Sequence, residues 1–450
     1  MRLSELLAAL PKVSVQAGGA DPDISLVTAD SRRVVPGALF VAVRGDHFDG
    51  HDFIPQAIEK GAAAIVAEGP LTPAPSPPST TGETIAPDAK RSGGGERVRG
   101  VIVPDSRAAL AWLSAAWRGF PARRLVMIGV TGTDGKTTTA TLIHAILIAA
   151  GLKAGLISTV SAVVGDETLD TGFHVTTPEA PEVQGYLARM VAAGLTHCVL
   201  EVTSHGLAQQ RVAGCEFDVA VVTNITHEHL DYHKTYENYR AAKAALFSGL
   251  SAAAPKPGVQ KTGVLNADDS SFGYLSSVLR ERSLTYSLRP GQANLCAAHI
   301  AHTPEGVHFQ VRVSGFQPPA SDLQITTSLV GDYNLSNCLA AIAATMCALG
   351  LLPEAAQRGI AAVKGVPGRM ERIDLGQPFT ALVDFAHTPN ALRRALETAR
   401  QMMTDERPER SGAQRSELET ARQMIADEHP ERSAAQRIGD DPPNDRRRAP

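Results

Sequence analysis

Long apolar runs that end in polar residues recur through the middle of the chain, at residues 124–132, 196–204, 217–226 and 261–269. Strands that are buried on both faces of a parallel sheet have this nearly continuous hydrophobic pattern, and functional loops follow their carboxyl ends. Helix-like stretches lie between the runs. The pattern predicts an α/β domain with a mostly parallel sheet over residues 125–365.

Shorter elements precede this region. Residues 37–43 are apolar and β-branched and lie between two turn signals, which predicts a strand. Residues 53–68 predict a helix, a stop at Gly61 and a second strand. A strand and a helix are expected over residues 101–121. Together these elements predict a small α/β domain over residues 1–124.

The C-terminal part begins with predicted strands and helices and ends in a charged, repeated segment. Residues 328–351 predict a strand, a loop and a long buried helix, and residues 366–400 predict the start of a third domain. The charged segment 396–417 is then repeated, with most positions matching, at 418–439. Too few apolar residues remain to bury a core, so we expect frayed helix or disorder over residues 401–450.

Composition narrows the class of protein. Of 450 residues, 43% are hydrophobic, and the net charge is −4, which gives no electrostatic reason to expect binding to nucleic acid or an anionic membrane. The 5 cysteines form no CxxC pair, which favours reduced thiols in a cytoplasmic protein. The longest apolar stretches, 143–150 and 338–352, fall short of the roughly 20 residues of a membrane span. Residues 69–100 are rich in Pro, Ser, Thr and Gly, and we expect a disordered insert there.

The stretch VTGTDGKTTTATLIHAIL joins an apolar strand to an amphipathic helix through glycines. Gly132 and Gly135 allow the backbone to turn its N–H groups toward an anion, and the helix N-terminus adds a positive dipole end. Lys136 is placed to reach the β- and γ-phosphates, and the hydroxyl of Thr137 to bind Mg²⁺. The general phosphate-loop pattern is not met strictly, because Val130 stands where its first Gly belongs. The expected ligand is ATP.

Other polar residues follow strand-like runs or extended loops. Glu201 ends one of the apolar runs, where a carboxylate close to a phosphate loop suits Mg²⁺. Thr176 and Thr177 precede a proline and offer hydroxyls to substrate oxygens. Arg211 has a planar donor fork that suits a carboxylate or phosphate.

Three histidines and one lysine are ambiguous from their residue type alone. His227, His229 and His233 lie close together, but the sequence offers no set of Cys or carboxylate residues at zinc spacing, and a single His is usually structural. Lys243 lies in a helical pattern, where a lysine ordinarily faces solvent.

Several motifs in matching order resemble the Mur ligase family, and within it the MurE branch. They are TGTDGKTT, TADSRRVVPGALFVAVRGDHFDGHDFI, HVTTPEAPE, LEVTSHGLAQQRV, TNITHEHLDYHKTYENYRAAKAALF, LVGDYNLSNCLAAIAA and GVPGRMERID. The resemblance covers residues 29–400 apart from the insert. It implies three domains: a small α/β UDP-binding domain, a central ATPase domain with the phosphate loop, and a Rossmann-like third domain, of which this chain has an incomplete start.

The resemblance also assigns residues to sites. The implied nucleotide-binding residues are Thr131, Gly132, Thr133, Asp134, Gly135, Lys136, Thr137, Thr138, Asn334, Arg369, Asp384 and His387. The implied contacts to the UDP-sugar substrate are Ala29, Ser31, His47, Phe48, Asp49, Thr176, Thr177, Thr203, Gln209 and Arg211. The implied metal-site residues are Thr137, Glu201, His229 and Lys243. The implied catalytic residues are Lys136, His229 and Lys243, with Lys243 carbamylated. Asp134 departs mildly from the family, in which Asn is common at this position.

The implied activity is ATP-dependent addition of a diamino acid, meso-diaminopimelate or L-lysine, to UDP-N-acetylmuramoyl-L-alanyl-D-glutamate through an acyl phosphate. A cytoplasmic monomer is expected, with ATP and Mg²⁺ as cofactors. The Asp-Asn-Pro-Arg-like motif of the family's third domain is absent from this sequence. Two alternatives therefore stay open: another Mur-fold ligase such as a folylpolyglutamate synthetase, and an inactive protein that binds the UDP-sugar and ATP.

Overall fold

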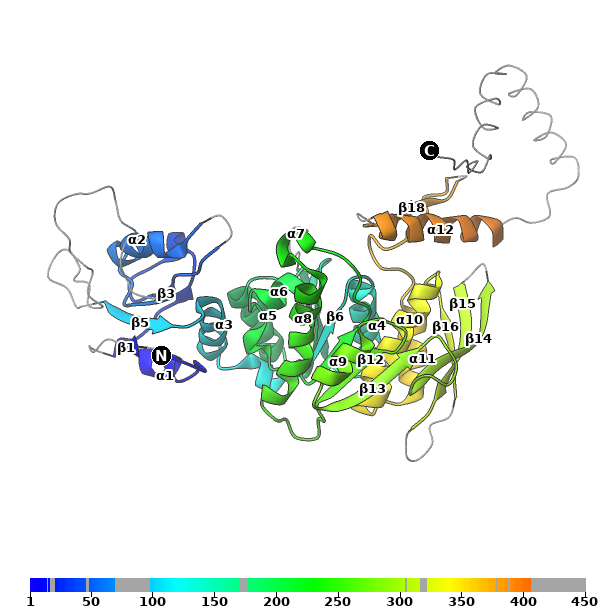
Figure 1. The fold of residues 1–450 in the computed structure, drawn as a ribbon, viewed down its shortest axis with the longest axis horizontal. Helices are drawn as coiled ribbons and strands as arrows, with labels where there is room; N and C mark the ends of the chain where they lie inside the picture. The colour runs from blue at the N-terminus through cyan, green and yellow to red at the C-terminus, as the bar shows by residue number, and fades with distance from the viewer. Residues whose placement is uncertain are drawn as a thin grey trace, which may run out of the picture. The chain divides into compact units, whose positions relative to one another are not determined.

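The structure is a computed structural model that describes residues 1–13, 15–16, 21–45, 48–68, 98–169, 176–303, 306–315, 322–377, 379–386 and 389–405. The chain divides into two compact units, Met1–Ala391 and Leu392–Pro450, and each is described by itself (Figure 1). Among the described residues, every helix is too short or too polar to cross a membrane.

Five strands from the described N-terminal residues form one sheet in the order β1-β5-β4-β3-β2, in which only the β1 edge is antiparallel. Its elements are α1 (Leu3–Leu7), β1 (Val15–Gln16), β2 (Val27–Thr28), β3 (Leu39–Val41), α2 (Ile54–Glu59), β4 (Ala64–Glu68), β5 (Arg99–Val103) and α3 (Ser106–Trp117). The predicted strand within 37–43 and the helix, stop and strand within 53–68 are confirmed. The predicted insert was too long at its end, because Arg99 and Gly100 pair with β4 as the start of β5. The rest of the insert, 69–97, lies outside the described residues.

The central sheet has eleven strands in the described part of the chain, in the order β16-β15-β14-β13-β12-β11-β6-β10-β7-β8-β9. Its strands are β6 (Val126–Thr131), β7 (Ala154–Ile157), β8 (Ala162–Val164), β9 (Glu167–Leu169), β10 (His197–Glu201), β11 (Val219–Val222), β12 (Thr262–Asn266), β13 (Arg282–Ser287), β14 (Leu295–Thr303), β15 (Gly306–Val313) and β16 (Leu323–Thr327). Its helices are α4 (Lys136–Ala149), α5 (Ala180–Ala192), α6 (Ser204–Ala208), α7 (Leu230–His233), α8 (Tyr236–Ser248), α9 (Phe272–Val278), α10 (Asp332–Ile342) and α11 (Pro353–Ala362). The four apolar runs are confirmed as the adjacent parallel strands β10, β6, β11 and β12.

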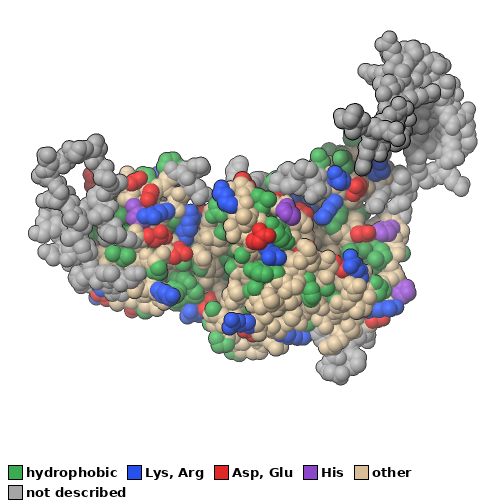
Figure 2. All heavy atoms as spheres, in the orientation of Figure 1, with side chains coloured by type: hydrophobic (Ala, Val, Ile, Leu, Met, Phe, Trp, Pro, Cys, Tyr) green, Lys and Arg blue, Asp and Glu red, His purple; other side chains and the backbone are tan. Residues whose placement is uncertain are grey.

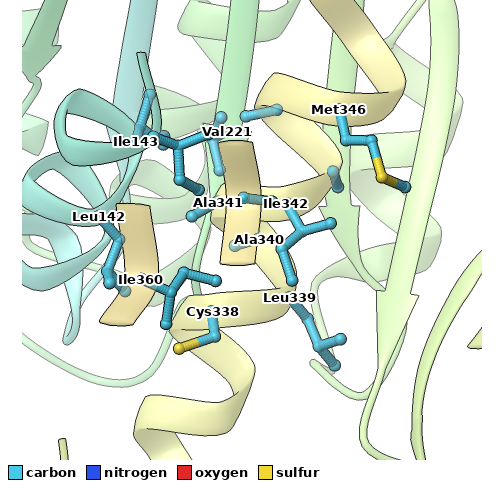
Figure 3. Close-up of a cluster of buried hydrophobic side chains, with 14 of the residues drawn as sticks. Leu142, Ile143, Val221, Cys338, Leu339, Ala340, Ala341, Ile342, Met346 and Ile360 are labelled. Atoms are coloured by element: carbon cyan, nitrogen blue, oxygen red, sulfur yellow. The ribbon is translucent and has the colours of Figure 1, made fainter. Parts of the chain in front are cut away.

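Each face of the central sheet is covered by helices, which explains the continuous apolar runs. Ile128 and Val130 of β6 join a core with α4, α10 and α11, and the alternate residue Met127 joins a second core with α5, α8 and α9. Figure 3 shows the first core, where Ile143 of α4 and Ile360 of α11 point toward α10. Since side chains alternate along a strand, both faces need apolar residues.

The expectation for residues 328–351 was partly wrong. The strand β16 ends at Thr327, and residues 328–330 are not a strand. The reason is local: Leu329 N donates to Thr327 Oγ1 (3.1 Å), and Gly331 has a φ of +89°, so the backbone turns instead of pairing. The predicted helix is α10, and it passes into a π-helical turn at Ala343–Cys347.

The C-terminal residues of the described chain form a short hairpin and a helix. The strands β17 (Glu371–Ile373) and β18 (Ala381–Val383) pair antiparallel, and α12 (Pro389–Asp405) extends past Arg400, where we expected frayed helix or disorder. The repeated segment lies outside the described residues beyond Asp405. The domain boundaries at 124 and 365 stay predictions.

Candidate active site

Four residues follow β6 and lead into α4, and we call them the phosphate loop: Gly132, Thr133, Asp134 and Gly135. Gly132 and Gly135 have φ values of +153° and +81°, which side chains rarely permit. A Cβ on Gly132 would overlap Thr223 Oγ1. The loop is bonded to the segment after β11: Thr133 N donates to Asn224 O (2.8 Å), and Asp134 N donates to Asn224 Oδ1 (3.0 Å). This anchoring fixes the backbone that leads into α4.

Parallel pairing brings the carboxyl ends of three strands together. Glu201 at the end of β10 is in register with Val130 of β6, and Val222 at the end of β11 is in register with Thr131. The loop after β6, Glu201 and the segment after β11 therefore lie at one edge of the sheet. That edge is where α/β proteins bind ligands.

Glu201 and Thr137, two of the residues expected at a magnesium site, are in direct contact. Glu201 is 1% exposed, and its carboxylate accepts hydrogen bonds from Thr137 Oγ1 (3.1 and 3.2 Å) and from both the N–H and Oγ1 of Thr159 (3.0 Å each). Arg369 Nη2 donates to Thr137 Oγ1 (3.3 Å). Lys136 starts α4, and its Nζ donates to Thr133 O (2.7 Å). The Lys136 ammonium is thus bonded to the backbone of the phosphate loop itself.

Lys243 is not on a solvent-exposed helix face. It is 1% exposed on α8, its Nζ donates to Gly132 O (2.6 Å), and it lies 4.6 Å from the ring centroid of Tyr239. Burial, together with the nearby charge of Lys136, holds the pKa of Lys243 well below its ordinary value. This lowered pKa favours the neutral amine, which is the chemical species that carbamylation requires.

His229 lies at the start of α7 with a φ of +54°, in a group of aromatic rings. Its ring centroid is 4.7 Å from that of His205, which in turn lies 5.4 Å from that of His233. Burial lowers the pKa of all three histidines. Within the described residues, no group of three or more His, Cys, Asp and Glu side chains is arranged to hold a metal ion. Of the predicted metal-site residues, Thr137 and Glu201 contact each other directly.

Four of the predicted substrate contacts form one hydrogen-bonded set. Thr177 Oγ1 lies 3.0 Å from Thr203 Oγ1 and accepts the N–H of Thr203 (3.0 Å). Arg211 donates to Thr177 O (2.8 Å) and twice to Gln209 Oε1 (2.6 and 3.0 Å). Its Nη2 is also 2.9 Å from Glu179 Oε1, a partner that the sequence did not indicate. Thr176 is half-buried at the start of this segment.

The other predicted substrate contacts belong to the N-terminal sheet. Asp49 accepts the N–H of His51 (2.9 Å) and lies 2.5 Å from His51 Nδ1, and bonding to His51 helps to lower the pKa of Asp49 although burial opposes it. Ser31 is buried, Ala29 is half-buried, and Phe48 is 75% exposed. His47 lies outside the described residues.

Asn337, a residue that sequence reasoning missed, links the predicted nucleotide contact Asn334 to α4. Asn337 Nδ2 donates to Asn334 Oδ1 (2.9 Å), and Asn337 Oδ1 accepts from Thr139 Oγ1 of α4 (3.2 Å). Asp384 accepts the N–H of Met370, the residue after Arg369 (2.8 Å). Thr131 and Thr138 are buried around the loop, and His387 lies outside the described residues. On the face that Figure 2 draws, basic and acidic side chains are interspersed.

Comparisons with known proteins identify the family. The model described as the Mur ligase middle domain matches residues 130–345, and the model described as the catalytic domain of the Mur ligase family matches residues 23–118. The UDP-N-acetylmuramoyl-L-alanyl-D-glutamate–2,6-diaminopimelate ligase of Geobacillus thermodenitrificans is 42% identical over 401 residues, which cover 89% of this chain and 75% of the relative. The chain belongs to the Mur ligase family.

Solved structures agree with this assignment. A UDP-N-acetylmuramoyl-L-alanyl-D-glutamate–2,6-diaminopimelate ligase superimposes with a TM-score of 0.66 at 28% identity, covering 84% of this Mur ligase and 70% of that chain. The folylpolyglutamate synthase of Mycobacterium tuberculosis, solved with ADP, reaches 0.51 at 20% identity over 66% of this chain and 69% of its own, which shows a shared fold alone. The predictions of the MurE branch, of its α/β fold and of an ATP-dependent acid–amino acid ligase are confirmed, and the folylpolyglutamate alternative is not favoured.

Proposed function

We propose that this Mur ligase uses ATP and Mg²⁺ to join a diamino acid, meso-diaminopimelate or L-lysine, to the D-Glu of UDP-N-acetylmuramoyl-L-alanyl-D-glutamate in peptidoglycan biosynthesis. The observation that carries the proposal is the double contact of Glu201. Its carboxylate accepts from Thr137 Oγ1 in the expected ATP site, and its backbone carbonyl accepts from Thr177 Oγ1 (3.2 Å) in the expected UDP-sugar site. One buried residue thus contacts both of the expected substrate sites.

The chemistry takes two steps. A γ-carboxylate oxygen of D-Glu attacks the γ-phosphorus of ATP, the bond to the bridging oxygen breaks, and ADP leaves with an acyl phosphate as the other product. The amine of the diamino acid then attacks the acyl carbon, loses a proton, and displaces inorganic phosphate. Lys136 moves from Thr133 O to the β- and γ-phosphates, where its ammonium neutralises charge that spreads over the transferring group. The N–H groups of the phosphate loop hold the same oxygens.

Thr137 and Glu201 would hold Mg²⁺. They place a hydroxyl and a carboxylate within 3.2 Å of each other, and Mg²⁺ is ordinarily bound by one or two carboxylates together with substrate phosphates. The ion supplies charge neutralisation at the phosphate oxygens when bound. A second site is proposed at Lys243 and His229: the neutral amine of Lys243 attacks CO2, releases a proton, and becomes a carbamate whose oxygens suit a second Mg²⁺.

The proposed setting is the cytoplasm, where ATP and UDP-linked sugars are available, and the proposed active form is a monomer. The partners are the UDP-linked dipeptide and the diamino acid. No part of the proposed reaction needs nucleic acid or a membrane.

The test measures how much ADP the full chain releases from ATP only when the UDP-linked dipeptide is present. The wild type, Lys136→Ala and Lys153→Ala are compared. Lys153 follows the opposite end of α4 and is exposed, so its substitution removes the same charge far from the loop. We expect Lys136→Ala to lose ADP release by about a thousandfold, since one well-placed transition-state contact commonly contributes 10²–10³ in rate. Lys153→Ala should match the wild type.

Ligation is then followed by supplying each diamino acid and measuring the tripeptide product. Near-normal ADP release from Lys136→Ala would contradict the assignment of the phosphate loop. Tight binding of ATP and the UDP-linked dipeptide by the wild type, with no ADP formed, would instead support the inactive-binder alternative. Turnover with a folate in place of the UDP-linked dipeptide would overturn the proposed substrate.

A further inference from the structure

A buried tyrosine on α8 contacts the phosphate loop directly. The side chain of Tyr239 is fully buried, and its hydroxyl oxygen lies 2.9 Å from Thr133 Oγ1. The same hydroxyl is 3.4 Å from Glu228 Oε2, which accepts from it. A buried phenol needs such partners, and here one of them belongs to the loop that is expected to bind ATP.

The side chain of Thr133 is held from two elements. Its Oγ1 accepts the N–H of Thr226 (2.9 Å) in the segment after β11 and contacts Tyr239 from α8. The backbone carbonyl of Thr133 accepts from Lys136 Nζ. The residue that holds the ammonium of Lys136 is thus itself fixed, in part, by the tyrosine hydroxyl.

The neighbouring loop residue is also held from α8. Lys243 donates to Gly132 O (2.6 Å) and lies against the ring of Tyr239, one helical turn away on the same face. Gly132 and Thr133 therefore have adjacent anchors on one helix. The geometry of the loop depends on both.

We propose that Tyr239 is a positioning residue for phosphoryl transfer, whose hydroxyl holds Thr133 and with it the phosphate loop in the conformation that receives ATP. The inference rests on the proposed function only in taking ATP as the ligand of this loop. It concerns ATP affinity, and it leaves the UDP-sugar contacts at Thr177 and Arg211 unaffected. Without the tyrosine hydroxyl, the side chain of Thr133 keeps only its contacts with the backbone of Thr226, and the loop samples conformations that bind ATP less well.

The test compares Tyr239→Phe with Tyr236→Phe. Tyr236 lies on the same helix, and its hydroxyl donates to Ile225 O (3.1 Å), so the control also loses one hydrogen bond to the segment after β11 but does not reach the loop. The Kd of ATP with Mg²⁺ is measured by calorimetry on the full chain, together with the Kd of the UDP-linked dipeptide and the melting temperature. Tyr239→Phe should weaken ATP binding about three- to tenfold, the range of one hydrogen bond. Tyr236→Phe should leave the Kd of ATP unchanged.

A double-mutant cycle tests the route through Thr133. Thr133→Val removes the partner hydroxyl in an isosteric side chain, and Thr133→Ser keeps it. Tyr239→Phe should add nothing to the ATP Kd of Thr133→Val and should keep its full effect in Thr133→Ser, because coupled residues are not additive. Additive effects, or equal weakening by Tyr239→Phe and Tyr236→Phe, would overturn the proposal.

Failure of the proposed function gives a different result. If the wild type binds ATP but ligates nothing, the ligase proposal fails while the Kd measurements still decide the role of Tyr239. If the wild type binds no ATP, both proposals are overturned.

Discussion

Replacing Gly132 by Ala tests whether the phosphate loop depends on a position without a side chain. A Cβ at this position would overlap Thr223 Oγ1 and lie 3.1 Å from Asn224 O. Neither atom can withdraw freely. Thr223 Oγ1 donates to Asp134 O (2.6 Å), and Asn224 O accepts the N–H of Thr133 (2.8 Å). The substitution must therefore either strain the loop or displace it.

Two costs add up for Gly132→Ala. The backbone, at a φ of +153°, costs an alanine about 1–3 kcal/mol. Forcing a methyl group into a space bounded by Thr223 and Asn224 costs about 1–3 kcal/mol more. We expect a loss of about 2–6 kcal/mol in the free energy of unfolding, or a displaced loop that avoids part of this cost. In the second case the Kd of ATP should rise by at least about thirtyfold, which corresponds to about 2 kcal/mol.

Gly151→Ala is the matched control for the backbone cost. Gly151 follows the other end of α4 with a φ of +78°, and a Cβ there would meet nothing within 4 Å. It should cost only about 1–2 kcal/mol and leave ATP binding unchanged. Thr223→Ala in the Gly132→Ala background removes the overlapping oxygen and should recover part of the loss. Urea unfolding and ATP calorimetry give both quantities. The steric argument is refuted if Gly132→Ala behaves like Gly151→Ala, or if Thr223→Ala recovers nothing.

Two further predictions concern buried charge. Asp218→Asn should lower the free energy of unfolding in urea by about 3–5 kcal/mol, because the fully buried carboxylate is bonded to Lys256 (2.5 Å) and Lys261 (2.7 Å). Since Asp218 lies at the amino end of β11, opposite the phosphate loop, the Kd of ATP should stay unchanged. A loss of stability below 1 kcal/mol would contradict this prediction. Burial, together with the neighbouring imidazole of His205, lowers the pKa of His233 to about 4, so the unfolded chain binds this proton first and stability is lost as pH falls from about 6.5 toward 4. His233→Phe should flatten that decline in urea unfolding at pH 7, 6 and 5, with the slope from the other buried histidines remaining, and an unchanged slope would exclude the assignment.

The parts of the site that sequence could predict are those with a local pattern. The apolar runs predicted the parallel strands because burial on both faces leaves a continuous signal. Lys136 and Thr137 follow glycines at a strand-to-helix junction, and Glu201 ends a strand. Each of these signals lies within a few residues of the position it identifies.

Residues whose partners are distant in the sequence have no such local pattern. Tyr239 and Asn337 lie on helices more than a hundred residues from their respective partners Thr133 and Thr139, and their helical patterns alone indicate only packing. Lys243 shows most clearly how little residue type and local pattern can predict about such a residue. By residue type it belongs on a solvent-exposed face, and its burial follows from the loop and the ring that surround it. The resemblance to a family identified this lysine, but the contacts explain its chemistry.

The strand order explains why these distant residues meet. The chain passes from β6 through α4 to β7, returns through α5 to β10 between them, and then crosses β6 to reach β11. The connections that follow β6 and β10 therefore lead to opposite sides of the strand order, and in α/β proteins ligands bind at the carboxyl ends of strands where this happens. The phosphate loop follows β6, whereas Glu201 ends the neighbouring strand β10 and Thr203 lies just beyond it. A phosphate donor on the first strand and a carboxylate acceptor beside the second would thus be adjacent, which is the arrangement that direct phosphoryl transfer between two substrates requires.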